Sequence, residues 1–429
     1  MKLSIRNLNI VRQADITVNG LAVIAGENGT GKSTIGKTLF ATLKAIAAAR
    51  GNSSATRDNA IADLADPIFS RLFRLRLSDD GHKIESAFPA SRSTFISEIS
   101  SLTSADDVDR YFTPVLEAVT DTSLRHLLES DINALSSYIA MPADSGATIA
   151  SALDSMLRSE FLSNISSGSA GYPEVSLTDP ASDSSLSYTI SHCEASITRH
   201  SAHSAFRDAT YIESPLYLHL LDILGKVSGA RIFGDPDSPA SLLLPAHVAD
   251  IVEKIELLRY TADMRAPRSP QLSSTLSQIA GGEFFYDSAR HAIMFRQGDN
   301  DIVPLNVASG VKSLGLLQIL LDNKIVAPDR PLIWDEPENH LHPSWQIRLA
   351  QFLVILAAQG IPVIVSTHSP YFIQGIRHFA VKLRAEQFVD FYLTEMDGTS
   401  SITQCVNDDL NRIFIKLAAP LNEIMDLSD

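Results

Sequence analysis

The stretch Gly26-Glu27-Asn28-Gly29-Thr30-Gly31-Lys32-Ser33 decides the fold of this chain of 429 residues. An apolar run, residues 21–25, precedes it and is typical of a buried strand, while residues 33–48 have the apolar spacing of a helix. A glycine-rich loop between a strand and a helix wraps its backbone N–H groups around a phosphate, and the helix points its positive end at that anion. The pattern therefore predicts a phosphate-binding loop in an α/β fold.

The residue types in this loop indicate ATP and Mg²⁺ as its ligands. We expect Lys32 to reach the β- and γ-phosphates and the Ser33 hydroxyl to ligate the Mg²⁺ ion. A chance glycine-rich turn is the alternative, which the flanking strand and helix disfavour. The predicted nucleotide contacts are Gly26, Asn28, Gly29, Thr30, Gly31, Lys32, Ser33 and Thr34.

A second apolar run, residues 332–334, ends in the carboxylate pair Asp335-Glu336. The carboxyl ends of the strands form the edge at which open α/β sheets bind ligands. We therefore expect Asp335 to hold the Mg²⁺ ion through its hydration shell, and Glu336 to be the catalytic residue that polarises the attacking water. Taken alone, the pair would be read as a solvated strand end, and the upstream phosphate-binding loop favours the functional interpretation.

A third apolar run, residues 361–365, is followed by Ser366-Thr367-His368. A histidine just beyond a buried strand can contact the γ-phosphate through its ring N–H, so His368 is the second candidate catalytic residue. The alternative is a polar side chain that only satisfies its own hydrogen bonds at the end of the strand. The order of the three motifs along the chain favours the functional interpretation.

Ser309 and Gly310 precede a helix that we predict over residues 314–321, and two interpretations of them stay open. Ser309 can be an ordinary cap of that helix. Alternatively, the helix end is a second phosphate-binding site, in which Gly310 permits close backbone approach. In that case the site would be offered to a nucleotide held by another subunit.

The composition excludes several classes of protein. A net charge of −15 argues against general nucleic-acid binding, which needs clustered Lys and Arg. The two cysteines are too few for a disulfide framework. Residues 1–6 resemble a strand rather than a signal peptide, and the most apolar run, residues 352–365, is interrupted by Gly360 and Pro362. We expect a cytoplasmic location and no membrane partner.

The motifs divide the chain into three parts. We predict the first part of an ATPase core over residues 1–48, a mainly helical insertion with a few core strands over 49–265, and the rest of the core over 266–429. The dipeptide Asn19-Gly20 predicts a hairpin turn between the second and third strands. The expected fold class is α/β, with a mainly parallel sheet, N-terminal antiparallel strands and an inserted helical lobe.

The order of phosphate-binding loop, Ala308-Ser309-Gly310, Asp335-Glu336 and His368 resembles that of ABC-type ATPases related to the RecF and chromosome-maintenance (SMC) proteins. The amino-acid sequence of residues 335–343 and 366–370 is more specifically similar to that of ATPases of bacterial anti-phage defence. These include the overcoming-lysogenization-defect (OLD) class and the ATPase subunits of Septu, retron and PARIS systems. The resemblance covers residues 1–48 and 280–429.

The resemblance implies a head-to-tail homodimer, or a higher oligomer, with two ATP molecules between one subunit's phosphate-binding loop and the other's signature. Ser309 and Gly310 would then contact ATP from the partner copy. A D-loop would fall at residues 339–342, with His342 where transporter heads carry an aspartate. Glu213 is a candidate for the position of the Q-loop glutamine.

The resemblance also implies a regulatory ATPase that responds to DNA or to a phage component. The OLD class carries a nuclease domain after the ATPase core, and about sixty residues follow His368 here. We therefore expect a separately encoded effector, a nuclease. The alternatives are a RecF-like DNA-repair clamp, a transporter ATPase, which the signature disfavours, and a scaffold that binds ATP without turnover.

Overall fold

The computed structural model describes residues 1–49, 54–76, 88–89, 91–102, 104–140, 146–162, 164–165, 171–201, 206–218, 220–221, 224, 244–258, 270–287, 290 and 292–417. The chain divides into two compact units. The larger unit comprises Met1–Ile46, Leu153–Gly229 and Leu242–Asp429, and the smaller unit comprises Ala47–Ala152 and Ala230–Ser241. Each unit has a hydrophobic core of its own.

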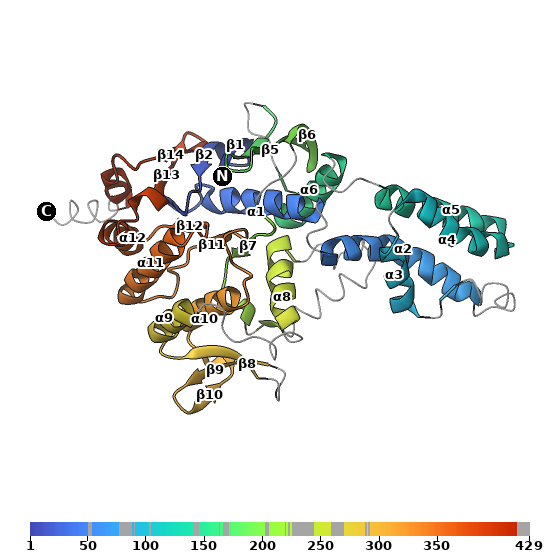
Figure 1. The fold of residues 1–429 in the computed structure, drawn as a ribbon. Helices are drawn as coiled ribbons and strands as arrows, with labels where there is room; N and C mark the ends of the chain where they lie inside the picture. Colours follow the sequence, from blue (N-terminus) through green and yellow to red (C-terminus); the bar gives the residue numbers. More distant parts are fainter. Residues whose placement is uncertain are drawn as a thin grey trace. The chain divides into compact units, whose positions relative to one another are not determined.

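A sheet of 11 strands organises the larger unit (Figure 1). In the order in which they lie in the sheet, its strands are β6 (Glu194–Ser201), β5 (Ser184–Ser191), β4 (Glu174–Asp179), β1 (Lys2–Leu8), β2 (Val11–Thr17), β14 (Ser400–Cys405), β13 (Val389–Asp397), β3 (Leu21–Gly26), β12 (Val363–Thr367), β11 (Leu332–Asp335) and β7 (Thr210–Ile212). Neighbours from β13 to β7 are parallel, and neighbours from β6 to β2 are antiparallel. The predicted α/β fold class is confirmed.

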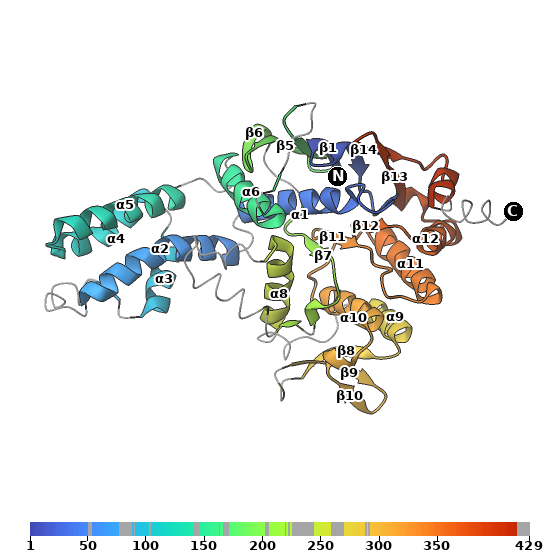
Figure 2. The same ribbon diagram turned by 180° about the vertical axis from the view of Figure 1, so that it is seen from behind.

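Helices cover both faces of the parallel strands. Successive side chains of a strand point to opposite faces, so neighbouring residues of β11 contact different helices. Leu332 and Trp334 of β11 belong to the apolar core that also contains residues of α10 (Ser309–Asp322), α11 (Pro343–Ala358) and α12 (Pro370–Lys382). Ile333, between them, meets α1 (Lys32–Ala49): a Cβ on Gly36 would lie 3.1 Å from its Cγ2 atom. Figures 1 and 2 both show α11 and α12 side by side.

The predicted hairpin turn at Asn19-Gly20 is wrong. β2 pairs with β1 and β14, whereas β3 pairs with β13 and β12, so the two strands are not neighbours. At this point the chain crosses from the antiparallel strands into the parallel ones. Gly20 is needed for another reason: its φ is 136°, and a Cβ there would lie 2.5 Å from the carbonyl oxygen of Phe388.

Two smaller features complete the larger unit. Strands β8 (Glu283–Asp287), β9 (Ala292–Gln297) and β10 (Asn300–Ile302) form a separate antiparallel sheet. Other helices among the described residues are α8 (Ala246–Leu258), α9 (Pro270–Ala280), η4 (Pro304–Asn306) and η5 (Glu386–Phe388).

The smaller unit is built from helices. These are α2 (Ser54–Arg76), α3 (Arg92–Ser100), α4 (Ala105–Ala118) and α5 (Thr122–Ile139). The boundary between the units falls within α6 (Gly146–Phe161), whose residues from Leu153 onward belong to the larger unit. Side chains cap two of them: Ser104 accepts from the N–H of Asp107, and Asp121 accepts from the N–H of Ser123. Apolar residues such as Phe95 and Phe112 are fully buried between the helices. Among the described helices, none is both long and apolar enough to cross a membrane.

Candidate functional site

The glycine-rich loop connects the end of β3 to the start of α1, as predicted. Gly29 and Gly31 have φ values of 77° and 91°, a conformation that glycine adopts without strain. A side chain at Gly31 is excluded, because its Cβ would lie 2.6 Å from Cγ2 of Val11. The Thr30 hydroxyl donates to the carbonyl of Glu27 at 2.9 Å and tightens the turn.

The other side chains of the loop that are predicted to contact the nucleotide are exposed or half-buried, except Lys32, which is hydrogen-bonded to the loop. Asn28 and Ser33 are exposed, and Thr34 is half-buried. The Lys32 ammonium donates to the carbonyls of Gly26 at 2.9 Å and Glu27 at 2.7 Å. Burial lowers the pKa of Lys32, while the carboxylates of Glu336 and Asp335 act in the opposite direction. The lysine and the two carboxylates therefore share one electrostatic environment.

Asp335 ends β11, where two hydroxyl groups hold its carboxylate. The Tyr211 hydroxyl donates to Oδ2 at 3.1 Å, and the Ser366 hydroxyl donates to Oδ1. Ser366 stands opposite Asp335 in the parallel pair of β11 and β12. Lys32, Tyr211, Asp335 and Ser366 line one small cavity. Tyr211 and Ser366 were not predicted as site residues, although they lie in β7 and β12, the two strands that neighbour β11.

The structure brings the two candidate catalytic residues together. The Glu336 Oε1 atom lies 3.1 Å from Nδ1 of His368, and the Asn339 amide donates to Oε2 at 2.8 Å. The backbone of Glu336 has a φ of 47°, a left-handed conformation that costs a non-glycine residue about 1–3 kcal/mol. Its N–H donates to the carbonyl of Ser366 at 3.1 Å, which anchors this turn to β12.

Glu338 is a further residue that the sequence did not single out. Its side chain is buried, and Oε1 accepts from the Thr367 hydroxyl and from the N–H of His368 at 3.2 Å. Its Oε2 atom is buried without a hydrogen-bond partner. Burial raises the pKa of Glu338, and the hydrogen bond from Thr367 opposes that rise. Glu338 thus joins the segment after β11 to the segment that carries His368.

Ser309 does not cap its helix, so that interpretation is wrong. Helix α10 begins at Ser309 rather than near residue 314, and Ala308 is its N-cap residue without a side-chain cap. Gly310 packs against the predicted D-loop: a Cβ there would lie 2.7 Å from Cδ2 of Leu341 and 2.9 Å from the carbonyl oxygen of His340. The signature is therefore joined to the segment that follows Glu336.

Two other predicted positions have local partners. Glu213 lies 2.8 Å from Nε2 of His247 and 3.9 Å from the Lys37 ammonium, so its contacts are with α8 and α1. His342 is the N-cap residue of α11, and its Nδ1 atom accepts from the N–H of Ser344 at 3.3 Å.

The family model described as "AAA domain, putative AbiEii toxin, Type IV TA system" matches residues 205–374. The matched range contains Ser309, Asp335, Glu336 and His368, and the phosphate-binding loop completes the motif set upstream. The match and the loop together identify a P-loop ATPase. Enzymes of this fold bind ATP and generally Mg²⁺.

Solved structures similar to this ATPase include the SMC head domain from Thermotoga maritima, with 11% identity, a TM-score of 0.39, and coverage of 94% of this chain and 98% of that one. Another is a Smc head domain with an extended coiled coil, bound to the C-terminal domain of ScpA derived from Pyrococcus furiosus. It has 13% identity, a TM-score of 0.42, and coverage of 99% of this chain and 98% of that one. No curated protein matches the sequence of the ATPase.

We predict that Glu336→Gln lowers the rate of ATP hydrolysis by about 10²–10⁴-fold, because a general base contributes a factor of that size. ATP affinity should be unchanged, since the amide keeps the shape of the side chain. Turnover assays and equilibrium ATP binding measure the two effects. Glu386→Gln, in η5, is the matched control and should behave as wild type. Undiminished hydrolysis by Glu336→Gln would mean that another residue activates the water.

We predict that Glu338→Ala lowers both the melting temperature and ATP turnover, because it leaves the Thr367 hydroxyl and the His368 N–H without their acceptor. Glu338→Gln keeps an acceptor oxygen and should retain turnover. The raised pKa means that wild type loses stability as pH rises above 4.5, whereas the uncharged glutamine does not. The melting temperature of Glu338→Gln relative to wild type should therefore rise from pH 5 to pH 8. An equal loss of turnover in both variants would contradict the role.

Proposed function

We propose that this ATPase is the regulatory subunit of an anti-phage defence system, and that it controls a separately encoded effector, a nuclease. The observation that carries the proposal is the match of residues 205–374 to a family described by the AbiEii toxin. A sequence that resembles that of defence ATPases also supports it: Asp335-Glu336-Pro337-Glu338-Asn339-His340-Leu341-His342-Pro343. DNA or a phage component would act as the trigger.

The loop between β3 and α1 fits the phosphates of ATP. Gly29 and Gly31 hold the left-handed conformations that turn backbone N–H groups inward, and Lys32 already bridges two carbonyls of the loop. A phosphate that replaced these carbonyls would contact the buried Lys32 ammonium, and burial strengthens the attraction between the two charges. We assign the β- and γ-phosphates to Lys32 on this basis.

Ser33 and Asp335 are the residues that would hold Mg²⁺. The exposed Ser33 hydroxyl and the Asp335 carboxylate, fixed by Tyr211 and Ser366, fit a Mg²⁺ ion that takes its other ligands from phosphates and water. Among the described residues, no group of three or more His, Cys, Asp or Glu side chains could hold a metal ion. When bound, Mg²⁺ neutralises charge on the phosphates.

Glu336 and His368 are the residues that we assign to hydrolysis. Asn339 and His368 hold the two oxygens of the Glu336 carboxylate, which gives a base the fixed orientation that water activation needs. In the proposed reaction, Glu336 accepts the hydrogen bond of the attacking water, and the His368 ring donates to the γ-phosphate.

A second copy would complete each site. The first turn of α10 has N–H groups with no side-chain cap, which suits them to phosphate oxygens supplied from outside the subunit. Gly310 packs on Leu341 of the same subunit, so a nucleotide that reached Ser309 would also press on the segment after Glu336. This arrangement supports a head-to-tail homodimer in which the signature of one copy senses the ATP of the other.

We predict that a bacterial host carrying the ATPase with its neighbouring genes resists phage, and that Lys32→Ala abolishes the resistance. Efficiency of plating measures the effect, and Glu386→Gln should protect as well as wild type. Deletion of the neighbouring nuclease gene should also abolish protection, because the ATPase only controls the effector. Full protection by Lys32→Ala, or by the ATPase gene alone, would contradict the proposal.

A further inference from the structure

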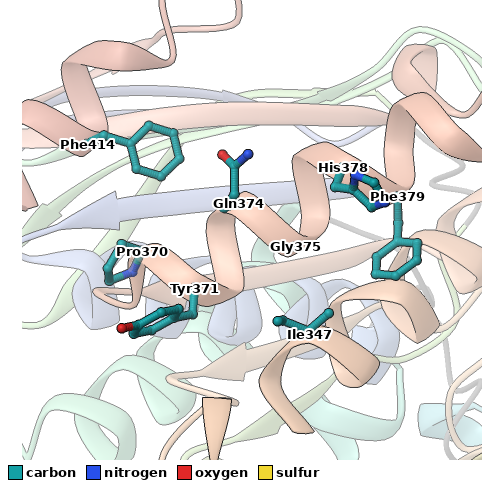
Figure 3. Close-up of a pocket in the computed structure, with 8 residues that line it drawn as sticks. All are labelled: Ile347, Pro370, Tyr371, Gln374, Gly375, His378, Phe379 and Phe414. Carbon is teal, nitrogen blue, oxygen red and sulfur yellow. The ribbon is translucent and has the colours of Figure 1, made fainter. Parts of the chain in front are cut away.

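A groove with an apolar lining lies where α12 meets α11 and the last described helical segment, residues 411–417. Its volume is about 540 Å³. Its lining comes from three elements and consists of Ile347, Pro370, Tyr371, Gln374, Gly375, His378, Phe379 and Phe414 (Figure 3). Gly375 lets the two helices approach closely, since a Cβ there would lie 3.0 Å from the Cβ of Ala350.

Large apolar side chains in this groove face solvent. Tyr371 is 59% exposed and Ile347 is 41% exposed, although α11 and α12 otherwise bury most of their apolar residues. Exposed apolar side chains that gather around one groove are typical of a binding surface rather than of scattered surface residues. A groove of this size between helices suits the apolar face of one further helix.

The groove also differs in charge from the rest of the protein. The chain has a net charge of −15, yet α11, α12 and residues 411–417 contain no Asp or Glu. Their Lys and Arg residues are Arg348, Arg377, Lys382, Arg412 and Lys416. Arg412 and Lys416 are paired with Glu395 and Glu27.

The exposed Lys382 ammonium lies 5.6 Å from the centre of the Phe379 ring at the groove wall. Arg377 is also exposed and directly precedes His378, a residue of the lining. Positive charge therefore borders an apolar floor.

We propose that this groove is the docking site for an acidic amphipathic helix of a partner protein. The apolar face of that helix lies on Tyr371, Ile347 and Phe414, and its carboxylates face Arg377 and Lys382. The inference rests on the proposed function, because it supplies the surface through which a separate effector meets the ATPase. An apolar floor favours a peptide over nucleic acid, whose phosphates would need basic residues alone.

The position of the groove couples it to the ATP site. Pro370 and Tyr371 open α12 directly after His368 and Ser369. The Ser369 hydroxyl caps α12 by accepting from the N–H of Phe372 and donates to the amide oxygen of Gln346 in α11 at 2.6 Å. A helix bound at the start of α12 therefore contacts the same short segment that carries His368, and its binding favours one position of that segment.

The test uses a synthetic helical peptide of about 16 residues, long enough to form a helix, with Leu on one face and Glu on the other. A second peptide carries Lys in place of every Glu. Fluorescence anisotropy with the full-length ATPase should show tighter binding of the Glu peptide than of the Lys peptide. Tyr371→Glu and Arg377→Glu should each weaken that binding by at least about tenfold, which corresponds to 1.4 kcal/mol. Tyr172→Glu, at an exposed tyrosine of the surface outside the groove, is the matched control.

Three outcomes would overturn the proposal: no binding of the Glu peptide, equal binding of the two peptides, or binding that both groove variants leave intact. A further variant of the ATPase lacks residues 418–429, which contain Glu423 and Asp426 among apolar residues. If the Glu peptide bound only to this shortened chain, residues 418–429 would be the occupant of the groove, and the proposal of a partner protein would be wrong. Phage protection is scored independently, so loss of peptide binding does not remove the proposed function.

Discussion

The parallel register of β3, β12 and β11 is the constraint on which the site depends. Val365 stands opposite Val23, and Asp335 stands opposite Ser366, so the three strands end at one edge. Each strand ends in a different motif: the phosphate-binding loop after β3, His368 after β12 and Glu336 after β11. Because hydrogen bonds between the strands fix their offsets, groups that are up to about 340 residues apart in the chain are placed within contact distance.

The sequence predicted the elements that local chemistry specifies and missed those that depend on pairing. The loop, Asp335, Glu336 and His368 follow from residue types beside buried strands. Asn19-Gly20 has the local sequence of a hairpin turn, and the hairpin is excluded only because β3 pairs with the distant strands β13 and β12.

Ser309 shows the same limit on a helix. The first turn of α10 is less apolar than the residues after it, so the periodicity placed the start of the helix too late. The positions of Tyr211 and Glu338 depend on which strand ends meet, which no local pattern records.

In the proposed dimer, the signature of one copy completes the ATP site of the other. Lys32→Ala prevents phosphate binding by the subunit's own loop, and Ser309→Arg blocks the signature that the subunit contributes to its partner's site. Each homodimer should therefore be inactive. In a mixed dimer, one site combines both lesions, and the other is intact. The decisive measurement is ATP binding and turnover after the two variants exchange subunits, with dimer formation confirmed separately. Activity should reappear on mixing. Mixed dimers that form without recovering ATP binding at one site would contradict the proposed dimer.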